Sequence, residues 1–392
     1  MALMDAMAME ATTDMAIKIK SKECCTGCEA CAQICPVDAI NFESDNEGFL
    51  YPIVDHRKCT ECGACERVCP VVNKNETREP IRIYAAKNRN EQIREASSSG
   101  GIFTLLAEAI IRDGGVVFGA KFNEQWEVVH DYTETIDGIA AFRGSKYVQS
   151  RIADNFKRAK EFLDAGRRVL FSGTPCQIAG LKLFLGRNYD NLLAMDFVCH
   201  SVPSPAVWRA YLKECVTDIR NIQIINFRDK SKGWRIWNLR INDKYKNRRK
   251  DPYTKGYLSN LYLRPSCLAC PAKPQRSGSD ITLADFWGVE KFLPESDDNR
   301  GMSLIAINSD RGDKIYKNIG ADSIEMTSSA YDKNTCYYNS VTAHENRTQF
   351  FEKFNSGNYQ LIPLIVSFMT PEPPLWAKIV WNSKRVIRGV FK

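Results

Sequence analysis

Residues 25–36 read CTGCEACAQICP and residues 59–70 read CTECGACERVCP. Both stretches follow the pattern C-x2-C-x2-C-x3-C-P, and the second begins 34 residues after the first. Three cysteines in so tight a loop place three thiolates around one centre, while the proline ends the following helix and turns the chain away. Small residues between the cysteines let the backbone approach sulfur and donate N–H groups to it; these are Gly27, Ala30, Gly63 and Ala64. The duplicated pattern therefore predicts a pair of sulfur-ligated metal sites.

This pattern resembles a bacterial ferredoxin with two [4Fe-4S] clusters, in which each run gives three thiolates to one cube and its fourth to the other. The resemblance implies one cube on Cys25, Cys28, Cys31 and Cys69, and another on Cys59, Cys62, Cys65 and Cys35. The alternative is a pair of zinc sites, because C-x2-C pairs also suit tetrahedral zinc. Four cysteines followed by proline, occurring twice, favour the clusters, and Cys24 is left over as an unligated thiol.

The composition limits what the rest of the chain can be. A chain of 392 residues, 44% hydrophobic and 26% charged, suits two or three globular domains. Nine of its fifteen cysteines lie between Cys24 and Cys69, a density that cytosolic proteins use for metals rather than disulfides. The formal charge of +7 invites a nucleic-acid partner, but each bound cluster adds about −2, so three clusters bring the sum to about +1. We therefore expect a cytoplasmic protein that binds no nucleic acid.

The two ends of the chain carry weaker signals. Residues 1–19 lack the basic start and continuous apolar run of a signal peptide, so we expect a disordered leader. No apolar stretch approaches the roughly 20 residues that a bilayer crossing needs. Near the C-terminus, Leu375, Ile379, Val386 and Val390 fall on one face of a basic amphipathic helix. Such a helix either contacts an anionic membrane peripherally or docks on protein, and docking is the commoner case.

Hydrophobic patterning predicts the elements of the body. Residues 71–80 have linker composition, which ends the ferredoxin-type domain at 20–75. A helix is expected from residue 102 to Gly114, then a strand pair at 116–122 and 126–132, and a helix ending near Gly166. Residues 167–186 and 191–205 form a strand, helix, strand unit. The segments 222–229 and 233–242 are strand-like, and a basic loop, KYKNRRK, follows at 244–250.

Four further cysteines belong to this body. Thr174 is the expected N-cap of the helix that Pro175 begins, which places Cys176 in a first turn whose free N–H groups favour a thiolate. Cys199 ends the next strand, and if the two strands are parallel neighbours both cysteines lie at the same carboxyl edge. With the close pair farther on, the candidate ligands of a third [4Fe-4S] cluster are Cys176, Cys199, Cys267 and Cys270. By spacing alone, zinc or simply buried cysteines stay open.

Six blocks of the body resemble the coenzyme F420 hydrogenase/dehydrogenase beta-subunit family. They are SSSGG (97–101), GSKYVQS (144–150), FSGTPCQIAGL (171–181), CHSVPSP (199–205), YLRPSCLAC (262–270) and SDITLADFWG (279–288). Members of this family are flavoproteins with at least one [4Fe-4S] cluster beside the flavin. The resemblance implies a two-part body, 80–165 and 166–350, before a C-terminal extension at 351–392. The expected fold class is α+β and α/β: a dicluster ferredoxin-like domain followed by a mixed α/β flavin-binding body. No G-x-G-x-x-G occurs in the body, so a Rossmann fold has no support.

The resemblance also implies FAD near the SSSGG and GTPCQ blocks. Both blocks offer helix N-termini with small or hydroxyl residues, which suit a pyrophosphate or the polar edge of an isoalloxazine. Lys146 places a cation where charge accumulates in reduced flavin, or else it is an exposed loop lysine. The cofactor-binding candidates are Ser98, Ser99, Gly100, Gly101, Gly144, Ser145, Lys146, Tyr147, Thr174 and Gln177.

Lys146 and His200 are the catalytic candidates. His200 follows a presumed cluster ligand and either donates a proton to substrate or makes an orienting hydrogen bond; Asp285 is a polar contact or a turn residue. The expected function is an oxidoreductase that passes electrons between a redox partner protein or ferredoxin, its own clusters, FAD and a two-electron small molecule such as a deazaflavin coenzyme. The alternative is a non-catalytic polyferredoxin subunit of a larger redox complex. The long body argues against it, because two cubes need only about 55 to 60 residues.

Overall fold

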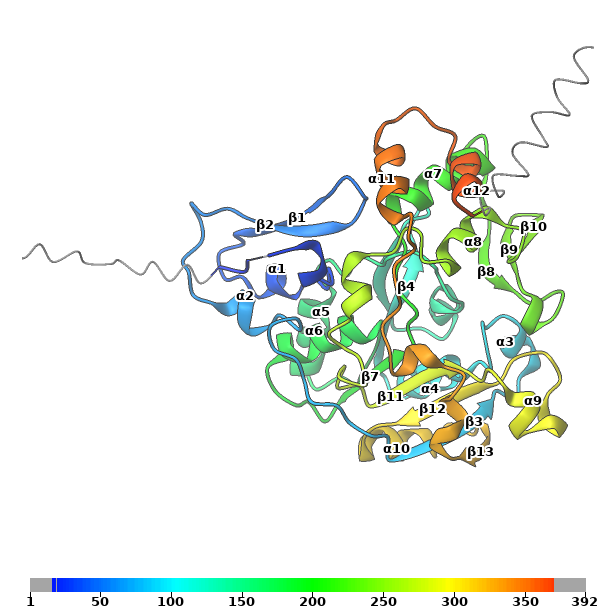
Figure 1. The fold of residues 1–392 in the computed structure, drawn as a ribbon. Helices are drawn as coiled ribbons and strands as arrows, with labels where there is room; N and C mark the ends of the chain where they lie inside the picture. The colour runs from blue at the N-terminus through cyan, green and yellow to red at the C-terminus, as the bar shows by residue number, and fades with distance from the viewer. Residues whose placement is uncertain (1–15, 19, 370–392) are drawn as a thin grey trace, which may run out of the picture.

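The computed structural model describes residues 16–18 and 20–369. Most of the expected leader and the whole of the basic tail helix lie outside the described residues. The chain forms a small N-terminal unit that lies against one side of a large body, next to α5 and α6 (Figure 1). We call residues 20–75 the dicluster unit.

The dicluster unit is built from two short helices and a hairpin. In each run the helix begins between the second and third cysteines, after a residue with positive φ: Glu29 at 60° before α1 and Gly63 at 67° before α2. These left-handed residues let the chain close a tight loop around the cysteines. The elements are α1 (Ala30–Ile34), β1 (Ile40–Ser44), β2 (Leu50–Val54) and α2 (Ala64–Arg67), and β1 pairs with β2 antiparallel.

The body is organised around one eight-stranded mixed sheet. Its strand order is β13-β3-β12-β11-β7-β6-β4-β5. The central strands β4, β6, β7 and β11 run parallel, and the others pair antiparallel. The strands are β3 (Arg82–Lys87), β4 (Val116–Phe122), β5 (Val128–Thr133), β6 (Val169–Ser172), β7 (Leu192–Phe197), β11 (Ile281–Asp285), β12 (Ser303–Ile307) and β13 (Asp322–Met326).

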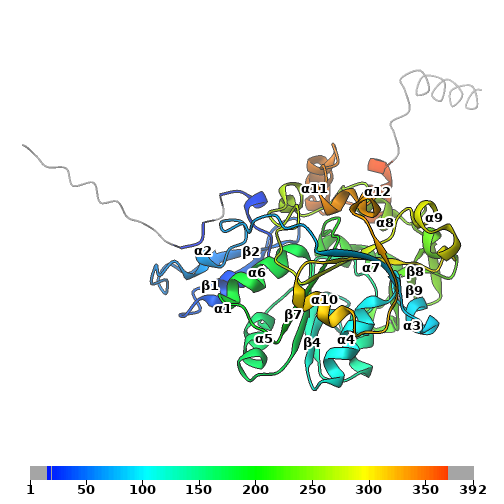
Figure 2. The ribbon, with the colours of Figure 1, turned by 90° about the horizontal axis from the view of Figure 1, so that it is seen from below.

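Helices cover both faces of this sheet. Because side chains alternate along a strand, Phe118 and Phe171 pack under α5 (Asn155–Asp164) and α6 (Pro175–Leu185). Their neighbours Val117 and Leu170 point to the other face, where α4 (Ile102–Arg112) and α10 (Asp310–Tyr316) lie. The two helical layers can be followed in Figure 2. The dicluster unit therefore meets the α5–α6 side, and α1 packs on both of these helices.

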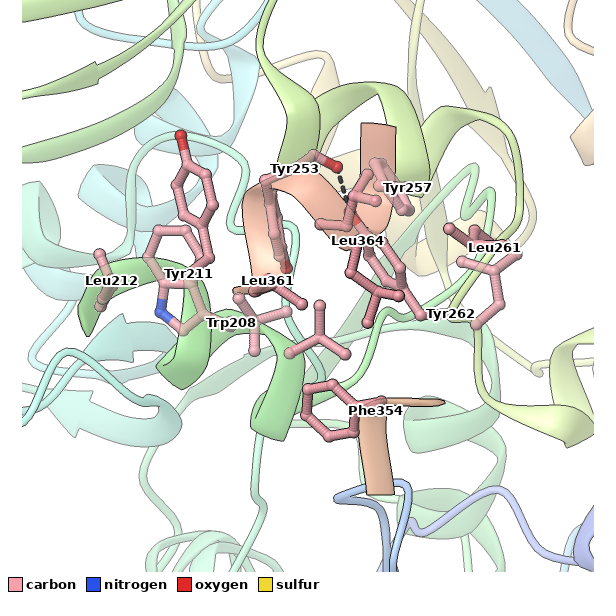
Figure 3. Packing of buried hydrophobic residues seen from close by; sticks show 14 of the residues in the cluster. Trp208, Tyr211, Leu212, Tyr253, Tyr257, Leu261, Tyr262, Phe354, Leu361 and Leu364 are labelled. Carbon is pink, nitrogen blue, oxygen red and sulfur yellow. Dashed lines mark hydrogen bonds between the residues drawn. The ribbon is translucent and has the colours of Figure 1, made fainter. Parts of the chain in front are cut away.

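A second, antiparallel sheet of β8 (Ile225–Asp229), β9 (Asn238–Ile241) and β10 (Lys244–Asn247) lies beside an aromatic core. The prediction of a loop at 244–250 is wrong for its first four residues, because β10 pairs with β9 through the backbone and the half-buried Lys246 donates to the Tyr211 hydroxyl at 3.2 Å. In the core, Trp208, Tyr253 and Tyr262 pack together, and the Tyr262 hydroxyl donates to the Tyr253 carbonyl (Figure 3). The helices here are α7 (Pro205–Cys215), α8 (Pro252–Leu258), α11 (Arg347–Asn355) and α12 (Leu361–Met369). Residues 351–369, expected in an extension, contribute Leu361 and Leu364 to this core.

The predicted elements at 102–112, 116–133, 155–164 and 169–197 are confirmed in place and type. The remaining helices are α3 (Glu91–Glu95) and α9 (Val289–Phe292), with 3-10 turns that include Pro265–Ala269. Across the described ranges, every helix is too short or too polar to span a bilayer.

Candidate functional site

Four cysteines of the dicluster unit line one small pocket that opens toward solvent. We call Cys35, Cys59, Cys62 and Cys65 the second thiol set. The Ala39 N–H donates to Cys35 Sγ at 3.3 Å and the Ile17 N–H to Cys65 Sγ at 3.2 Å, as backbone donors do around ligating thiolates. Within residues 16–18 and 20–369, no three His, Cys, Asp or Glu side chains are placed to hold a single metal ion. Four thiols that line one pocket are the donor chemistry of a sulfur-ligated cluster.

A second group of cysteines lies deeper, against the body. We call Cys25, Cys28, Cys31 and Cys69 the first thiol set. Burial raises the pKa of Cys28 and of Cys31, and in both cases the thiolate of Cys69 raises it further. The Ala30 backbone N–H acts in the opposite direction on Cys28. Cys35, the fourth cysteine of the first run, lines the pocket of the second thiol set, which is the crossed arrangement that the ferredoxin resemblance implies.

The body cysteines also meet. Because β6 and β7 are parallel neighbours, Cys176 in α6 and Cys199 after β7 lie at the same carboxyl edge. Burial, then the thiolate of Cys270, raise the pKa of Cys176 to about 11. Burial raises the pKa of Cys199, and the thiolates of the other three cysteines raise it further. We call Cys176, Cys199, Cys267 and Cys270 the third thiol set.

The three sets form one continuous series. Gly180 in α6 faces Cys28, so that a Cβ atom on Gly180 would lie 2.9 Å from Cys28 Sγ. Beyond burial and its own set, the pKa of Cys28 is raised by Cys176 of the third set. Cys31 of the first set and Cys65 of the second set belong to one small buried cluster. The second set also reaches the surface, because Cys62 is exposed.

The loops at 97–101 and 143–147 lie side by side. Ser98 Oγ accepts a hydrogen bond from the Ser145 N–H at 2.7 Å. Ser99 Oγ donates to the Met302 carbonyl at 2.8 Å, and the Gly100 N–H donates to Ser303 Oγ at 3.0 Å. These hydroxyls therefore hold the loops to each other and to β12. Gly101, with φ 81°, begins α4 without a side-chain cap, which leaves first-turn N–H groups for another acceptor.

Lys146, Thr174 and Gln177 converge near His130. Lys146 Nζ donates to the carbonyls of Arg143 at 3.0 Å and Gly144 at 3.2 Å, and burial lowers the pKa of Lys146 to about 7. Burial, with the Lys146 charge added, lowers the pKa of His130 to about 4. Gln177 Nε2 donates to the Ser150 carbonyl at 3.2 Å, and Gln177 Oε1 accepts from the Thr174 N–H at 2.9 Å. Both ends of the Gln177 amide are engaged, so this side chain fixes the start of α6.

A buried arginine stands between these loops and β11. Arg228 NH1 pairs with Asp285 at 2.7 Å and lies 3.4 Å from the Tyr147 hydroxyl. Its guanidinium carbon lies 5.3 Å from the ring centre of Trp237 and 5.6 Å from that of Trp287. In the described part of the chain, Arg228 Nε and the indole N–H groups of Trp234 and Trp237 lack hydrogen-bond partners. Orphaned buried donors beside the two loops fit the polar edge of a bound cofactor.

His200 is held from two sides. Its Nε2 lies 2.7 Å from Asn260 Oδ1 and its Nδ1 lies 3.4 Å from Cys336 Sγ. Tyr257 meets the ring edge-on at 5.4 Å, and burial lowers the pKa of His200. With both nitrogens engaged, the imidazole is oriented beside Cys199.

Sequence reasoning missed several residues of this region. Arg228 and Trp237 lie far along the chain from His130 and from the two loops, and tertiary contacts place Arg228 beside Tyr147 and Asp285. Arg264 lies inside the block YLRPSCLAC, yet an isolated arginine gives no signal that it is buried.

Comparisons with known proteins match family models to parts of the chain. A family model for the C-terminal part of the coenzyme F420 hydrogenase/dehydrogenase beta subunit matches residues 166–332. Two models, both described as "4Fe-4S dicluster domain", match residues 24–73 and 55–112. Among solved structures, a similar chain occurs in the F420-reducing [NiFe] hydrogenase complex from Methanosarcina barkeri, which was studied by xenon derivatization. The two chains are 14% identical and superpose with a TM-score of 0.46. The match covers 71% of this chain and 89% of that chain. No curated protein matches. The chain is therefore an iron–sulfur redox protein that joins a 4Fe-4S dicluster domain to a domain related to the coenzyme F420 hydrogenase/dehydrogenase beta subunit.

Proposed function

We propose that the protein is an iron–sulfur flavoenzyme that passes electrons between a redox partner, three [4Fe-4S] clusters and FAD, and reduces or oxidises a two-electron small molecule. The observation that carries this proposal is the continuous series of three thiol sets, from exposed Cys62 to the carboxyl edge of the sheet at Cys199. When bound, the clusters supply one-electron transfer, and the flavin exchanges single electrons for a hydride. The family description makes a deazaflavin coenzyme one candidate substrate.

The exposed end of the series is the proposed docking point for a partner protein or ferredoxin. Cys62 is exposed, and Val37, which lines the same cavity, is 38% exposed. The Ala64 N–H lowers the pKa of the Cys62 thiol, which favours its ligating form.

At the other end, the paired loops 97–101 and 143–147 and the α4 and α6 N-termini are the proposed flavin-binding elements. Arg228 and Trp237 supply buried N–H groups, and Lys146 supplies a cation that titrates near neutral pH. In this proposal His200 positions groups beside Cys199, or transfers a proton once a substrate displaces one of its present partners.

The direct test is anaerobic purification with iron, sulfide and flavin quantified per chain. Three clusters correspond to about twelve iron atoms and two clusters to about eight. Cys176→Ala is expected to lose about four irons and to stop ferredoxin from reducing the flavin. Cys215→Ala is the matched control, because Cys215 is also a half-buried body cysteine but lies at the end of α7, outside the three sets.

Each outcome of this test separates the two function classes. Iron and flavin together support the enzyme. About twelve irons without flavin, in protein reconstituted with FAD, contradicts it and leaves a polyferredoxin subunit. Unchanged iron in Cys176→Ala removes the third set from the proposal.

A further inference from the structure

One charged side chain is enclosed between the dicluster unit and the body. Arg264 is 0% exposed and lies three residues before Cys267 in the third thiol set. Its Nε donates to the Cys25 carbonyl at 2.9 Å, and its NH2 donates to the Leu50 carbonyl at 2.9 Å. Arg264 therefore belongs to the body by sequence and to the dicluster unit by its hydrogen bonds.

The guanidinium also touches the loop that carries the first thiol set. A Cβ atom on Gly27 would lie 2.9 Å from Arg264 NH1, so the guanidinium packs closely against the backbone of this loop. Gln149 completes the contact, since its Oε1 accepts from Arg264 NH1 at 2.9 Å and its Nε2 donates to the Thr26 carbonyl at 3.2 Å. The ring of Tyr51 lies 4.4 Å from the guanidinium carbon.

Arg264 differs from the other deeply buried arginines in having no carboxylate partner. Arg94 pairs with Asp298 at 2.6 Å and Arg228 with Asp285 at 2.7 Å. No Asp or Glu among residues 16–18 and 20–369 lies within ion-pair distance of Arg264. Burial raises the pKa of Glu29 and the charge of Arg264 acts to lower it, but the ion pair of Glu29 is with Arg151, at 3.7 Å. A guanidinium stays charged in proteins, and a buried charge without compensation is strongly unfavourable. The hydrogen-bond acceptors of Arg264 are neutral carbonyl and amide oxygens, so a full negative charge nearby would stabilise it further.

The nearby negative charge belongs to the thiol sets. Arg264 joins the third thiol set directly through its backbone, because the Cys267 N–H donates to the Arg264 carbonyl at 3.0 Å. Each four-thiolate cluster carries about −2 when oxidised and gains one more negative charge on reduction. A fixed cation between two such groups favours their reduced states.

We propose that Arg264 is the shared counter-cation of the first and third thiol sets, which holds the dicluster unit against the body and raises the reduction potentials of both clusters. This inference rests on the proposed function, because it needs clusters at both sets. The second thiol set is an internal reference, since Arg264 is absent from the lining of its cavity.

The test is an EPR-monitored redox titration of the anaerobic, fully loaded protein. In Arg264→Gln, two of the three midpoint potentials are expected to fall while the third stays at the wild-type value. Arg264→Lys keeps the charge and loses the forked hydrogen bonds, so its potentials stay close to wild type while its thermal unfolding midpoint falls. Arg94→Gln is the matched control, because Arg94 is also buried but pairs with Asp298; it is expected to lower stability and leave all potentials in place.

A second variant covers the case in which Arg264→Gln does not load iron. Gln149→Glu places a carboxylate against Arg264 NH1 and neutralises the cation in place, and it is expected to lower the same two potentials. The inference is overturned if Arg264→Gln binds its full iron content and its midpoint potentials are unchanged. If Arg264→Gln does not bind iron, the same result in Gln149→Glu overturns it. Either result leaves the proposed function intact. A wild-type protein with only about eight irons refutes the third cluster instead.

Discussion

Gly180 of α6 faces Cys28 of the dicluster unit so closely that a methyl group on Gly180 would meet Cys28 Sγ at 2.9 Å and Cys28 Cβ at 3.1 Å. Glycine is a poor helix residue, costing about 1 kcal/mol relative to alanine, so its presence inside α6 has a packing reason. The missing side chain lets the first thiol set approach the helix that presents Cys176.

Substitution of Gly180 tests this close approach. Gly180→Val is expected to destabilise the protein by about 1–3 kcal/mol, because the added atoms overpack the contact with Cys28. Gly180→Ala improves the helix propensity of α6 but crowds Cys28 less than valine does, so its net loss of stability is expected to be smaller. Denaturant unfolding measures both variants, and slower electron transfer from the dicluster unit to the third set accompanies the loss. A Val variant as stable as wild type would show that the two units do not pack as described.

The hairpin of the dicluster unit is held to the body by a buried ion pair. Arg347 NH1 donates to Glu47 Oε1 at 3.1 Å, with the Glu47 side chain 11% and the Arg347 side chain 14% exposed. Glu47→Ala is expected to cost about 3–5 kcal/mol, because it leaves Arg347 buried and unpaired. Thermal unfolding and protease sensitivity of the hairpin measure the loss. The control is Arg220→Ala, which removes an 87% exposed partner and is expected to change little.

Lys146 makes stability depend on pH. Burial lowers its pKa to about 7 in the folded state from 10.5, so between these values the unfolded chain binds more protons. Stability therefore rises with pH from about 7 toward 10, by at most about 1.4 kcal/mol per pH unit from this group. Lys146→Met removes that slope, whereas Lys157→Met, at a surface lysine, keeps it. The measurement is the unfolding free energy at pH 6, 8 and 9.5. If this free energy rises with pH as steeply in Lys146→Met as in wild type, the prediction is wrong.

Arg228 separates flavin binding from cluster binding. Arg228→Gln removes the buried cation beside the 143–147 loop, and we expect flavin per chain to fall while iron per chain stays unchanged. Arg300→Gln is the control, because Arg300 is 58% exposed and pairs with Glu91. Flavin absorbance and iron content are measured on the same samples. Loss of both cofactors together would indicate general unfolding, and loss of neither would exclude Arg228 from the flavin site.

The local pattern of the chain predicted its elements well where one strong signal was present. Helix and strand boundaries were predicted correctly at three kinds of signal. These are the proline after each fourth cysteine, the glycines before residues 102 and 116, and the Thr174-Pro175 start of α6. Strand β10 was missed because its charged and polar residues show no apolar alternation along the strand. The packing of α12 on the aromatic core was missed because residues 361–369 carry no signal of their partner.

By itself, the sequence determined which side chains are candidate metal ligands: cysteines at a fixed spacing, duplicated in the dicluster unit, and four more that are spread along the body. Ligand spacing is a local property of the chain, so it can be read from the sequence. Tertiary structure alone decided how these thiols combine. Cys28 meets Gly180, Arg264 enters the dicluster unit from 239 residues away, and Arg228 finds Asp285, because each contact is made when two separately folded surfaces exclude water between them. The role of a buried charge such as Arg264 can be inferred only from the tertiary structure, since burial determines which groups must neutralise that charge.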